Sequence, residues 1–234
     1  MKNIKGKIEL VMAVLVLLGA GVLGRQGAKI VSAASGDNEG QLPQYQVVID
    51  VGHGGIDSGK VSAEGVLEKD VNLVIAKKLG ALLEQSDVAV TYTRESDTGL
   101  YQEGDSNKKV ADLQNRCALI EKIDPACTVS IHQNSYSAPE VRGAQVFYYG
   151  QSEEGKRLAE QIQQSLISRV DPDNHRQAKE NDSYYLLKRT VSPTVIVECG
   201  FLSCPQEAAQ LIDDTYQDRI AWAIHMGVMQ YLHR

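Results

Sequence analysis

Two histidines and one glutamate stand where three predicted strands end, and side chains of these types can bind a metal or transfer a proton. His53 follows the predicted strand that ends at Asp50, His132 closes a run that begins at residue 127, and Glu198 closes one that begins at residue 194. Because open α/β sheets bind ligands at the carboxyl ends of their strands, we expect these three side chains to face one site. The pattern indicates a metal centre with a carboxylate beside it.

Each histidine also has a structural interpretation. His53 could simply form a hydrogen bond within its turn, but the glycines at 52, 54 and 55 let backbone approach a ligand closely, which favours a ligand role. His132 could be a histidine satisfied within the core, and the residues alone leave that alternative open. No HExxH motif is present in the sequence, so the fold has to assemble any metal site from distant segments.

Glu198 is the candidate catalytic base. It follows the apolar run at 195–197, so we expect its carboxylate to lie in surroundings of low dielectric constant. Burial raises the pKa of a carboxylate toward the range in which it exchanges protons near neutral pH. The structural alternative is a salt bridge at the end of the sheet, with Arg94 or Arg116 as the partner.

Strand and helix signals alternate along the chain and predict the frame that would position these residues. The class is α/β, a three-layer αβα sandwich with a mostly parallel central sheet of about six strands. The expected strands are 46–50, 88–93, 127–132, 144–149, 184–187 and 194–198. The expected helices are 71–85, 108–123, 153–169, 205–212 and 216–232, with a polar loop at 171–182.

The N-terminal residues are predicted to direct export. Residues 1–7 carry three lysines, an uncharged apolar run follows at 10–24, and small residues lie beyond it, so 1–34 is typical of a signal peptide or N-terminal membrane anchor. The apolar run is short for a membrane span of about twenty residues, and the sequence leaves both forms open. Residues 35–44 are expected to form a linker and 45–234 the catalytic domain. Contact with a membrane is expected only through the N-terminal segment.

Composition narrows the possible partners. The net charge of −6 and the lack of a long basic run argue against nucleic acid as a partner. The four cysteines form no CxxC pair, which excludes a zinc ribbon by spacing. They could pair as disulfides in an exported protein or serve as small buried apolar residues, and the sequence leaves this open.

Five stretches in order along the chain carry a family resemblance: 48–55, 67–70, 93–94, 130–134 and 197–203. Together they resemble the zinc-dependent N-acetylmuramoyl-L-alanine amidases, often called amidase type 3. The resemblance implies that His53, Glu68 and His132 hold Zn²⁺ and that Glu198 is the general base. Without it, Glu68 would be read as an exposed residue at a helix start. Arg94 and Asn134 are further candidates, as residues that orient substrate or ligands.

The resemblance also implies a substrate and a setting. The substrate would be peptidoglycan, cut at the amide between the lactyl group of N-acetylmuramic acid and L-alanine. The chain is most similar to the small spore-cortex, or germination-specific, amidases, which implies a role in forming muramic-δ-lactam. It also implies an accessory spore or wall protein as a partner, and a location at the cell wall or in the forespore intermembrane space. The alternatives are an exported zinc peptidase that cuts within stem peptides and a non-catalytic wall-binding protein.

Overall fold

A six-stranded sheet forms the centre of the fold in the computed structural model, which describes residues 43–233. The strands are β1 (Tyr45–Val51), β2 (Val88–Tyr92), β3 (Cys127–Asn134), β4 (Gln145–Tyr148), β5 (Lys179–Glu180) and β6 (Thr194–Phe201). Their order across the sheet is β2-β1-β3-β6-β4-β5, and only the β4–β6 pair is antiparallel. The predicted sheet of six mostly parallel strands is confirmed.

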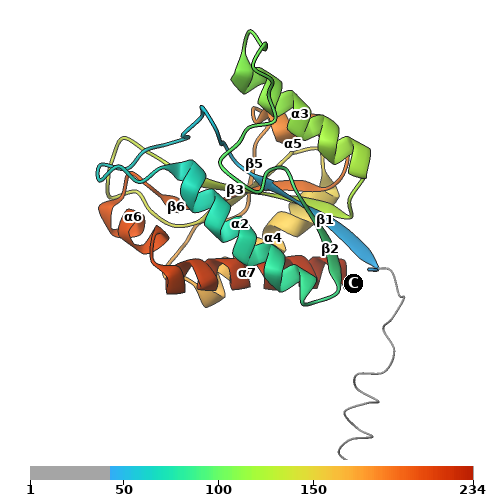
Figure 1. The fold of residues 1–234 in the computed structure, drawn as a ribbon. Coiled ribbons are helices and arrows are strands. Elements are labelled where there is room, and N and C mark those ends of the chain that lie inside the picture. The colour runs from blue at the N-terminus through green and yellow to red at the C-terminus, as the bar shows by residue number, and fades with distance from the viewer. Residues whose placement is uncertain (1–42, 234) are drawn as a thin grey trace, which may run out of the picture. The chain divides into compact units, whose positions relative to one another are not determined.

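Helices cover both faces of this sheet, as the three-layer prediction requires (Figure 1). They are α2 (Glu68–Glu84), α3 (Lys108–Ile123), α4 (Glu153–Arg169), α5 (Tyr185–Arg189), α6 (Pro205–Leu211) and α7 (Asp214–Leu232). Helices α2, α4 and α7 pack against one face, whereas α3 and α5 pack against the other. The predicted αβα sandwich is therefore confirmed.

Strand β1 shows how the sequence pattern produces these layers. Side chains alternate between the two faces of a strand, and β1 is apolar on both. Val47 and Ile49 face the large core shared with α2, α4 and α7, whereas Val48 packs with Cys117 of α3 and Leu186 of α5. Burial on both faces is typical of a central parallel strand, and it fixes the direction in which the following turn leaves the sheet.

Helix α2 begins at Glu68, earlier than the predicted start at residue 71. Asp70, which would cap a helix that begins at residue 71, lies inside the first turn, and Leu67 holds the cap position without a side-chain hydrogen bond. The Glu68 carboxylate instead accepts a hydrogen bond from the backbone N–H of Lys60, at 2.7 Å. That contact ties the helix start to the loop that follows β1.

The prediction of a strand at 184–187 was wrong, because Tyr185–Arg189 forms the short helix α5. Tertiary packing explains the difference: Leu186 reaches the cluster around Val48, while Leu187 packs with Phe147 and Ile196. A short helix places consecutive leucines in these two clusters on the same face of the sheet, whereas a strand would point them in opposite directions. The edge strand β5 lies instead within the stretch expected to be a loop.

The four cysteines are buried and free, in line with the interpretation as small apolar residues. Cys117 belongs to α3, Cys127 opens β3 and Cys199 lies within β6, while Cys204 precedes α6. Burial raises the pKa of the Cys127 thiol to about 12. Such a thiol stays protonated and unreactive near neutral pH.

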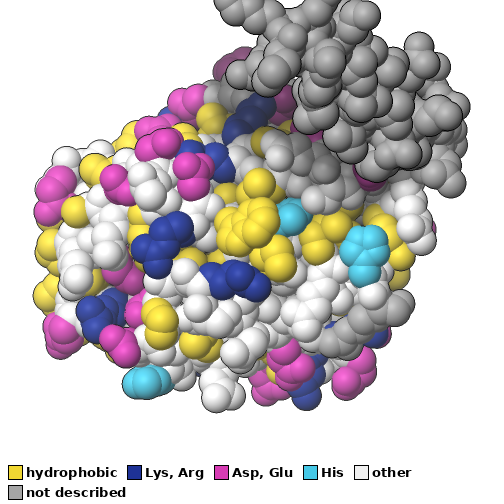
Figure 2. Space-filling view, turned by 90° about the horizontal axis from the view of Figure 1, so that it is seen from below, with side chains coloured by type: hydrophobic (Ala, Val, Ile, Leu, Met, Phe, Trp, Pro, Cys, Tyr) yellow, Lys and Arg dark blue, Asp and Glu magenta, His cyan; other side chains and the backbone are white. Residues whose placement is uncertain are grey.

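The outer surface of the layer formed by α2, α4 and α7 carries side chains of both charges, with some hydrophobic side chains between them (Figure 2). Exposed hydrophobic side chains on these helices include Val74 of α2 and Trp222 of α7, which are 40% and 45% exposed. Within the part of the chain that the structure describes, no helix is long and apolar enough to cross a membrane. The predicted signal or anchor at 1–34 and most of the linker lie outside the described residues.

Candidate metal centre and active site

The turn after β1 holds His53 in an unusual backbone conformation. Its φ is 60°, and Gly54 and Gly55 follow at 131° and 56°. Residues other than glycine seldom adopt positive φ, so the surrounding structure has to hold His53 there. Gly52 is required for a different reason, because a Cβ at this position would lie 2.4 Å from the imidazole ring of His132. The turn therefore brings two distant histidines into contact.

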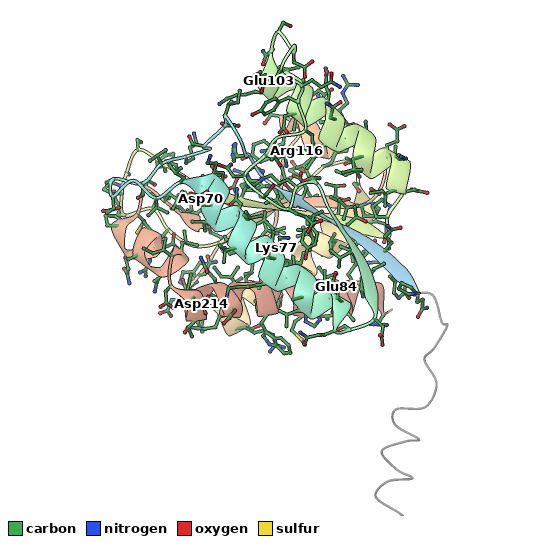
Figure 3. All side chains as sticks on the ribbon, viewed as in Figure 1. Asp70, Lys77, Glu84, Glu103, Arg116 and Asp214 are labelled. Carbon is green, nitrogen blue, oxygen red and sulfur yellow. The ribbon has the colours of Figure 1, made fainter. Side chains whose placement is uncertain are left out.

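Two buried arginines hold the backbone of this turn. Arg116 projects from α3 toward the sheet (Figure 3) and donates hydrogen bonds to Val51 O at 2.6 Å and His53 O at 2.7 Å. Arg94 donates to Val51 O, to Gly52 O at 3.0 Å and to Lys69 O at 2.7 Å, so it joins the turn to α2. The hydrogen bonds that the Arg94 side chain makes within residues 43–233 all go to backbone carbonyls.

The charge of Arg116 is balanced by Asp50, the last predicted residue of the first strand. The two side chains form a buried ion pair at 2.8 Å. Burial alone would raise the pKa of Asp50, but the charge of Arg116 and a hydrogen bond from Ser130 hold it below its usual range. An ionised pair of this kind is costly to break from one side, because the remaining charge stays buried.

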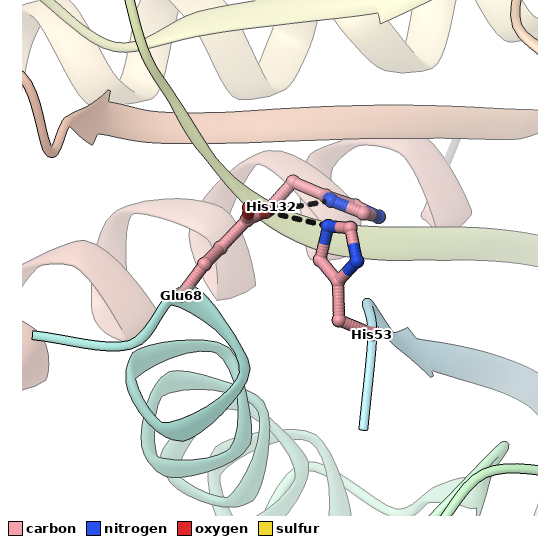
Figure 4. A group of neighbouring side chains, drawn as sticks. All are labelled: His53, Glu68 and His132. Atoms are coloured by element: carbon pink, nitrogen blue, oxygen red, sulfur yellow. Dashed lines mark hydrogen bonds and ion pairs between the residues drawn. The ribbon is translucent and has the colours of Figure 1, made fainter. Parts of the chain in front are cut away.

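His53, Glu68 and His132 come together from three elements of the fold (Figure 4). Their candidate ligand atoms all lie within 4.8 Å of one another. His53 Nε2 and His132 Nδ1 approach the same oxygen, Glu68 Oε1, at 3.1 and 2.9 Å. The two imidazole rings meet edge to face, with centroids 4.9 Å apart. Two imidazoles and one carboxylate form the donor set of an open zinc site.

Glu68 is held by backbone as well as by the histidines. Its carboxylate is buried and accepts the N–H groups of Lys60 at 2.7 Å and Gln133 at 3.1 Å. Burial raises its pKa, but hydrogen bonds with His132 and His53 outweigh that effect and lower it well below its usual range. Glu68 therefore stays ionised at neutral pH, as a metal ligand must.

Asp57 is a residue that the sequence analysis missed. Its carboxylate lies 2.7 Å from His53 Nδ1 and 2.7 Å from Lys109 Nζ. Burial raises its pKa, but the hydrogen bonds from His53 and Lys109 lower it to about 2. Because an ionised carboxylate only accepts, His53 Nδ1 donates this hydrogen bond to Asp57, and Nε2 is the nitrogen that faces Glu68. The sequence feature that could have pointed to Asp57 is its position, four residues after a candidate ligand histidine.

Glu198 lies on β6 directly beside His132 on β3, because the two residues are partners in the parallel register. Its side chain is buried, and Oε2 has no hydrogen-bond partner among the described residues. Burial raises the pKa of Glu198 to about 7, and the charge of His132 only partly opposes this. Among residues 43–233, Glu198 forms no ion pair, so Arg94 and Arg116 are not its partners as the structural alternative supposed.

Asn134 closes β3, two residues beyond His132. Its side chain accepts the N–H of Ser135 at 2.8 Å, and its backbone carbonyl accepts the N–H of Leu202 at 2.9 Å. These contacts place Asn134 in the turn that joins the ends of β3 and β6. A role of Asn134 or Arg94 toward substrate remains a prediction.

Comparison with known proteins identifies the family of this arrangement. The family model described as N-acetylmuramoyl-L-alanine amidase matches residues 47–230. The germination-specific N-acetylmuramoyl-L-alanine amidase of Bacillus subtilis is 38% identical over 188 residues, which cover 79% of this chain and 78% of that protein.

Solved structures agree with this result. The CwlD amidase of Clostridioides difficile, solved in complex with the GerS lipoprotein, has a TM-score of 0.79 and 41% identity, covering 81% of this chain and 98% of that one. The amidase AmiC2 of Nostoc punctiforme has a TM-score of 0.71 and 34% identity, covering 81% and 98%. The chain described here therefore belongs to the N-acetylmuramoyl-L-alanine amidase family, and it is an enzyme whose substrate is peptidoglycan.

Proposed function

We propose that this amidase is zinc-dependent, with His53, Glu68 and His132 as the metal ligands and Glu198 as the general base. The observation that carries the proposal is the convergence of three ligand atoms, within 4.8 Å of one another, from a turn, a helix start and a strand end. Glu198 occupies the strand position beside His132, which supports its assignment as the base.

The donor atoms fit a dication such as Zn²⁺. His53 Nε2 and His132 Nδ1 both face Glu68 Oε1, at 3.1 and 2.9 Å, so two imidazole nitrogens and one carboxylate oxygen are close enough to bind one ion. The hydrogen bond from His53 Nδ1 to Asp57 is the partner that ligand histidines usually have on their other nitrogen. When bound, zinc supplies Lewis acidity, which lowers the pKa of water and polarises a carbonyl oxygen.

Glu198 moves the proton in the proposed mechanism. A pKa of about 7 lets its carboxylate accept a proton from the attacking water, and Oε2 has no competing partner among the described residues. The water oxygen bonds to the lactyl carbonyl carbon, the C–N bond breaks, and Glu198 returns the proton to the departing nitrogen. The products are unsubstituted N-acetylmuramic acid and a peptide with L-alanine at its N-terminus.

Analysis of the cleavage products tests this reaction. Purified full-length protein with zinc is incubated with peptidoglycan, and the products are identified by mass spectrometry. We expect intact stem peptides with N-terminal L-alanine. Shortened stems that remain attached to sugar would instead indicate a peptidase, and the lack of any cleavage would favour the non-catalytic alternative.

We also propose a role in the maturation of spore cortex for germination, supported by the similarity to the germination-specific amidase of Bacillus subtilis. An accessory lipoprotein is the proposed partner, because the similar CwlD amidase was solved in complex with the GerS lipoprotein. The signal or anchor proposed for residues 1–34 would place the enzyme outside the cytoplasm, secreted or membrane-anchored at the cell wall, with the forespore intermembrane space as the candidate compartment. Loss of muramic-δ-lactam from the muropeptides of spores that lack the protein would support this role, and an unchanged muropeptide profile would contradict it.

A further inference from the structure

Arg176 lies on the side of Glu198 away from the metal ligands, next to strand β4. Gln145 on β4 is the antiparallel partner of Glu198, so the two side chains stand on the same face of the sheet. Arg176 donates a hydrogen bond from Nη1 to Gln145 Oε1 at 3.2 Å. One glutamine side chain therefore separates this guanidinium from the proposed catalytic base.

The structure holds the Arg176 side chain in one place. Its Nε donates to Arg142 O at 2.8 Å, and the guanidinium carbon lies 4.7 Å from the ring centroid of Phe201. Phe201 ends β6, the strand that carries Glu198. A guanidinium fixed by stacking and by hydrogen bonds loses little further entropy when it binds a ligand.

The loop beneath Arg176 is fixed as well. Asn174 is buried, accepts the N–H of Arg176 at 3.0 Å and donates to Ala144 O at 2.8 Å. Gly143 lies against it at φ 99°, and a Cβ there would be 2.7 Å from Asn174 Oδ1. The close packing shows that the position of Arg176 is built into the fold.

The charge of Arg176 has no carboxylate partner within residues 43–233, and its Nη2 makes no hydrogen bond there. Arg176 lines a polar cavity of about 630 Å³ together with Arg142 and His175. Asp171 and Asp173 also line the cavity, but the Asp171 carboxylate accepts the N–H of Asp173 and neither forms an ion pair with Arg176. Nη2, and the second hydrogen of Nη1, are thus left without a partner among the described residues.

We propose that Arg176 binds a free carboxylate of the stem peptide and determines which peptides this amidase accepts. Stem peptides are acidic, and the protein has a net charge of −6, so an anionic substrate needs a local cation. Arginine pairs with carboxylates through two parallel hydrogen bonds. The proposal rests on the assignment of Glu198 as the catalytic base. With that assignment, only the Gln145 side chain separates Arg176 from the residue that acts on the scissile amide.

Matched substrates test the proposal with the zinc-loaded, full-length enzyme. They are N-acetylmuramoyl dipeptides in which one carboxylate at a time is either free or converted to its amide. We expect the wild type to prefer one free carboxylate by about 10- to 100-fold in kcat/KM, the range for one hydrogen bond to a charged group. Arg176→Gln should lower kcat/KM for the free-carboxylate substrate to the value for the amidated one, with the zinc content unchanged, and Arg176→Lys should restore part of the preference.

Arg157 provides the matched control. Its guanidinium carbon lies 4.6 Å from the ring centroid of Tyr231, much as Arg176 lies over Phe201, but it belongs to α4 and pairs with Glu154. Arg157→Gln should leave the preference unchanged. Equal cleavage of every free and amidated pair by the wild type would overturn the proposal, as would an equal loss on all substrates in Arg176→Gln.

Binding to Glu198→Gln, measured by calorimetry with the same ligands, separates this inference from the proposed function. Tighter binding of the free carboxylate supports Arg176 even if the wild type cleaves neither substrate, a result that would refute the proposed function. Equal binding of the free and amidated ligands refutes the role of Arg176.

Discussion

Glu198 should make the metal-free protein less stable as the pH rises, and Glu198→Gln should remove this effect. Burial raises the pKa of Glu198 from 4.5 to about 7, so between these values the folded protein binds more protons than the unfolded chain. The free energy of unfolding then falls with rising pH, because the unfolded chain ionises first. At about 1.4 kcal/mol per tenfold change in the protonation equilibrium, the loss is about 3 kcal/mol.

Glutamine has nearly the shape of glutamate and stays neutral, so the variant lacks this pH-dependent loss. We expect wild type and Glu198→Gln to have similar stability near pH 4.5 and the variant to be more stable by about 3 kcal/mol near pH 8. Glu68 and Asp57, whose pKa values are lowered, titrate at more acidic pH and are present in both proteins. Urea unfolding in the presence of a chelator, at several pH values, measures the difference. Parallel stability curves for the two proteins would refute the assignment of a raised pKa to Glu198.

Three further substitutions test other parts of the site. Glu198→Ala should keep zinc and fold but lower kcat by about 10²- to 10⁴-fold, the usual contribution of a general base; unchanged kcat would remove Glu198 from the mechanism. Asp57→Ala should weaken zinc affinity by about 10- to 100-fold, because His53 loses the partner that orients its ring; equal affinity in a competition titration would contradict that role. Arg116→Met should destabilise the protein by about 3–5 kcal/mol, because Asp50 is left as a buried charge without its partner. Urea unfolding at pH 7 measures this loss, and a change below about 1 kcal/mol would show that the pair matters little.

The sheet could be predicted from the sequence because its strands carry their own signals. The apolar run before His53 and the run before Glu198 are short, continuous and bounded by glycine or proline, which is typical of buried parallel strands. Their carboxyl ends share one edge of the sheet, so the proximity of His53, His132 and Glu198 followed from topology alone. The short helix α5 could not be predicted in this way, because the clusters around Leu186 and Leu187 decide its conformation.

The supporting residues of the site were harder to find for a related reason. Glu68 reaches the histidines because α2 starts there and a backbone N–H from the preceding loop binds its carboxylate. Asp57 matters through one hydrogen bond inside an irregular turn, and Arg116 through carbonyl groups more than sixty residues away. Neither helical nor strand periodicity reports on contacts of this kind, which depend on the conformation of the His53 turn.

The zinc content of the purified protein tests the central assignment most directly. With His53, Glu68 and His132 as ligands, elemental analysis of the full-length protein should find about one zinc ion per chain. His132→Ala removes one of these three ligands, and we expect it to lose most of the metal while circular dichroism shows an unchanged fold. Full zinc occupancy in His132→Ala would contradict the account, as would a wild-type protein that binds no zinc when the metal is supplied.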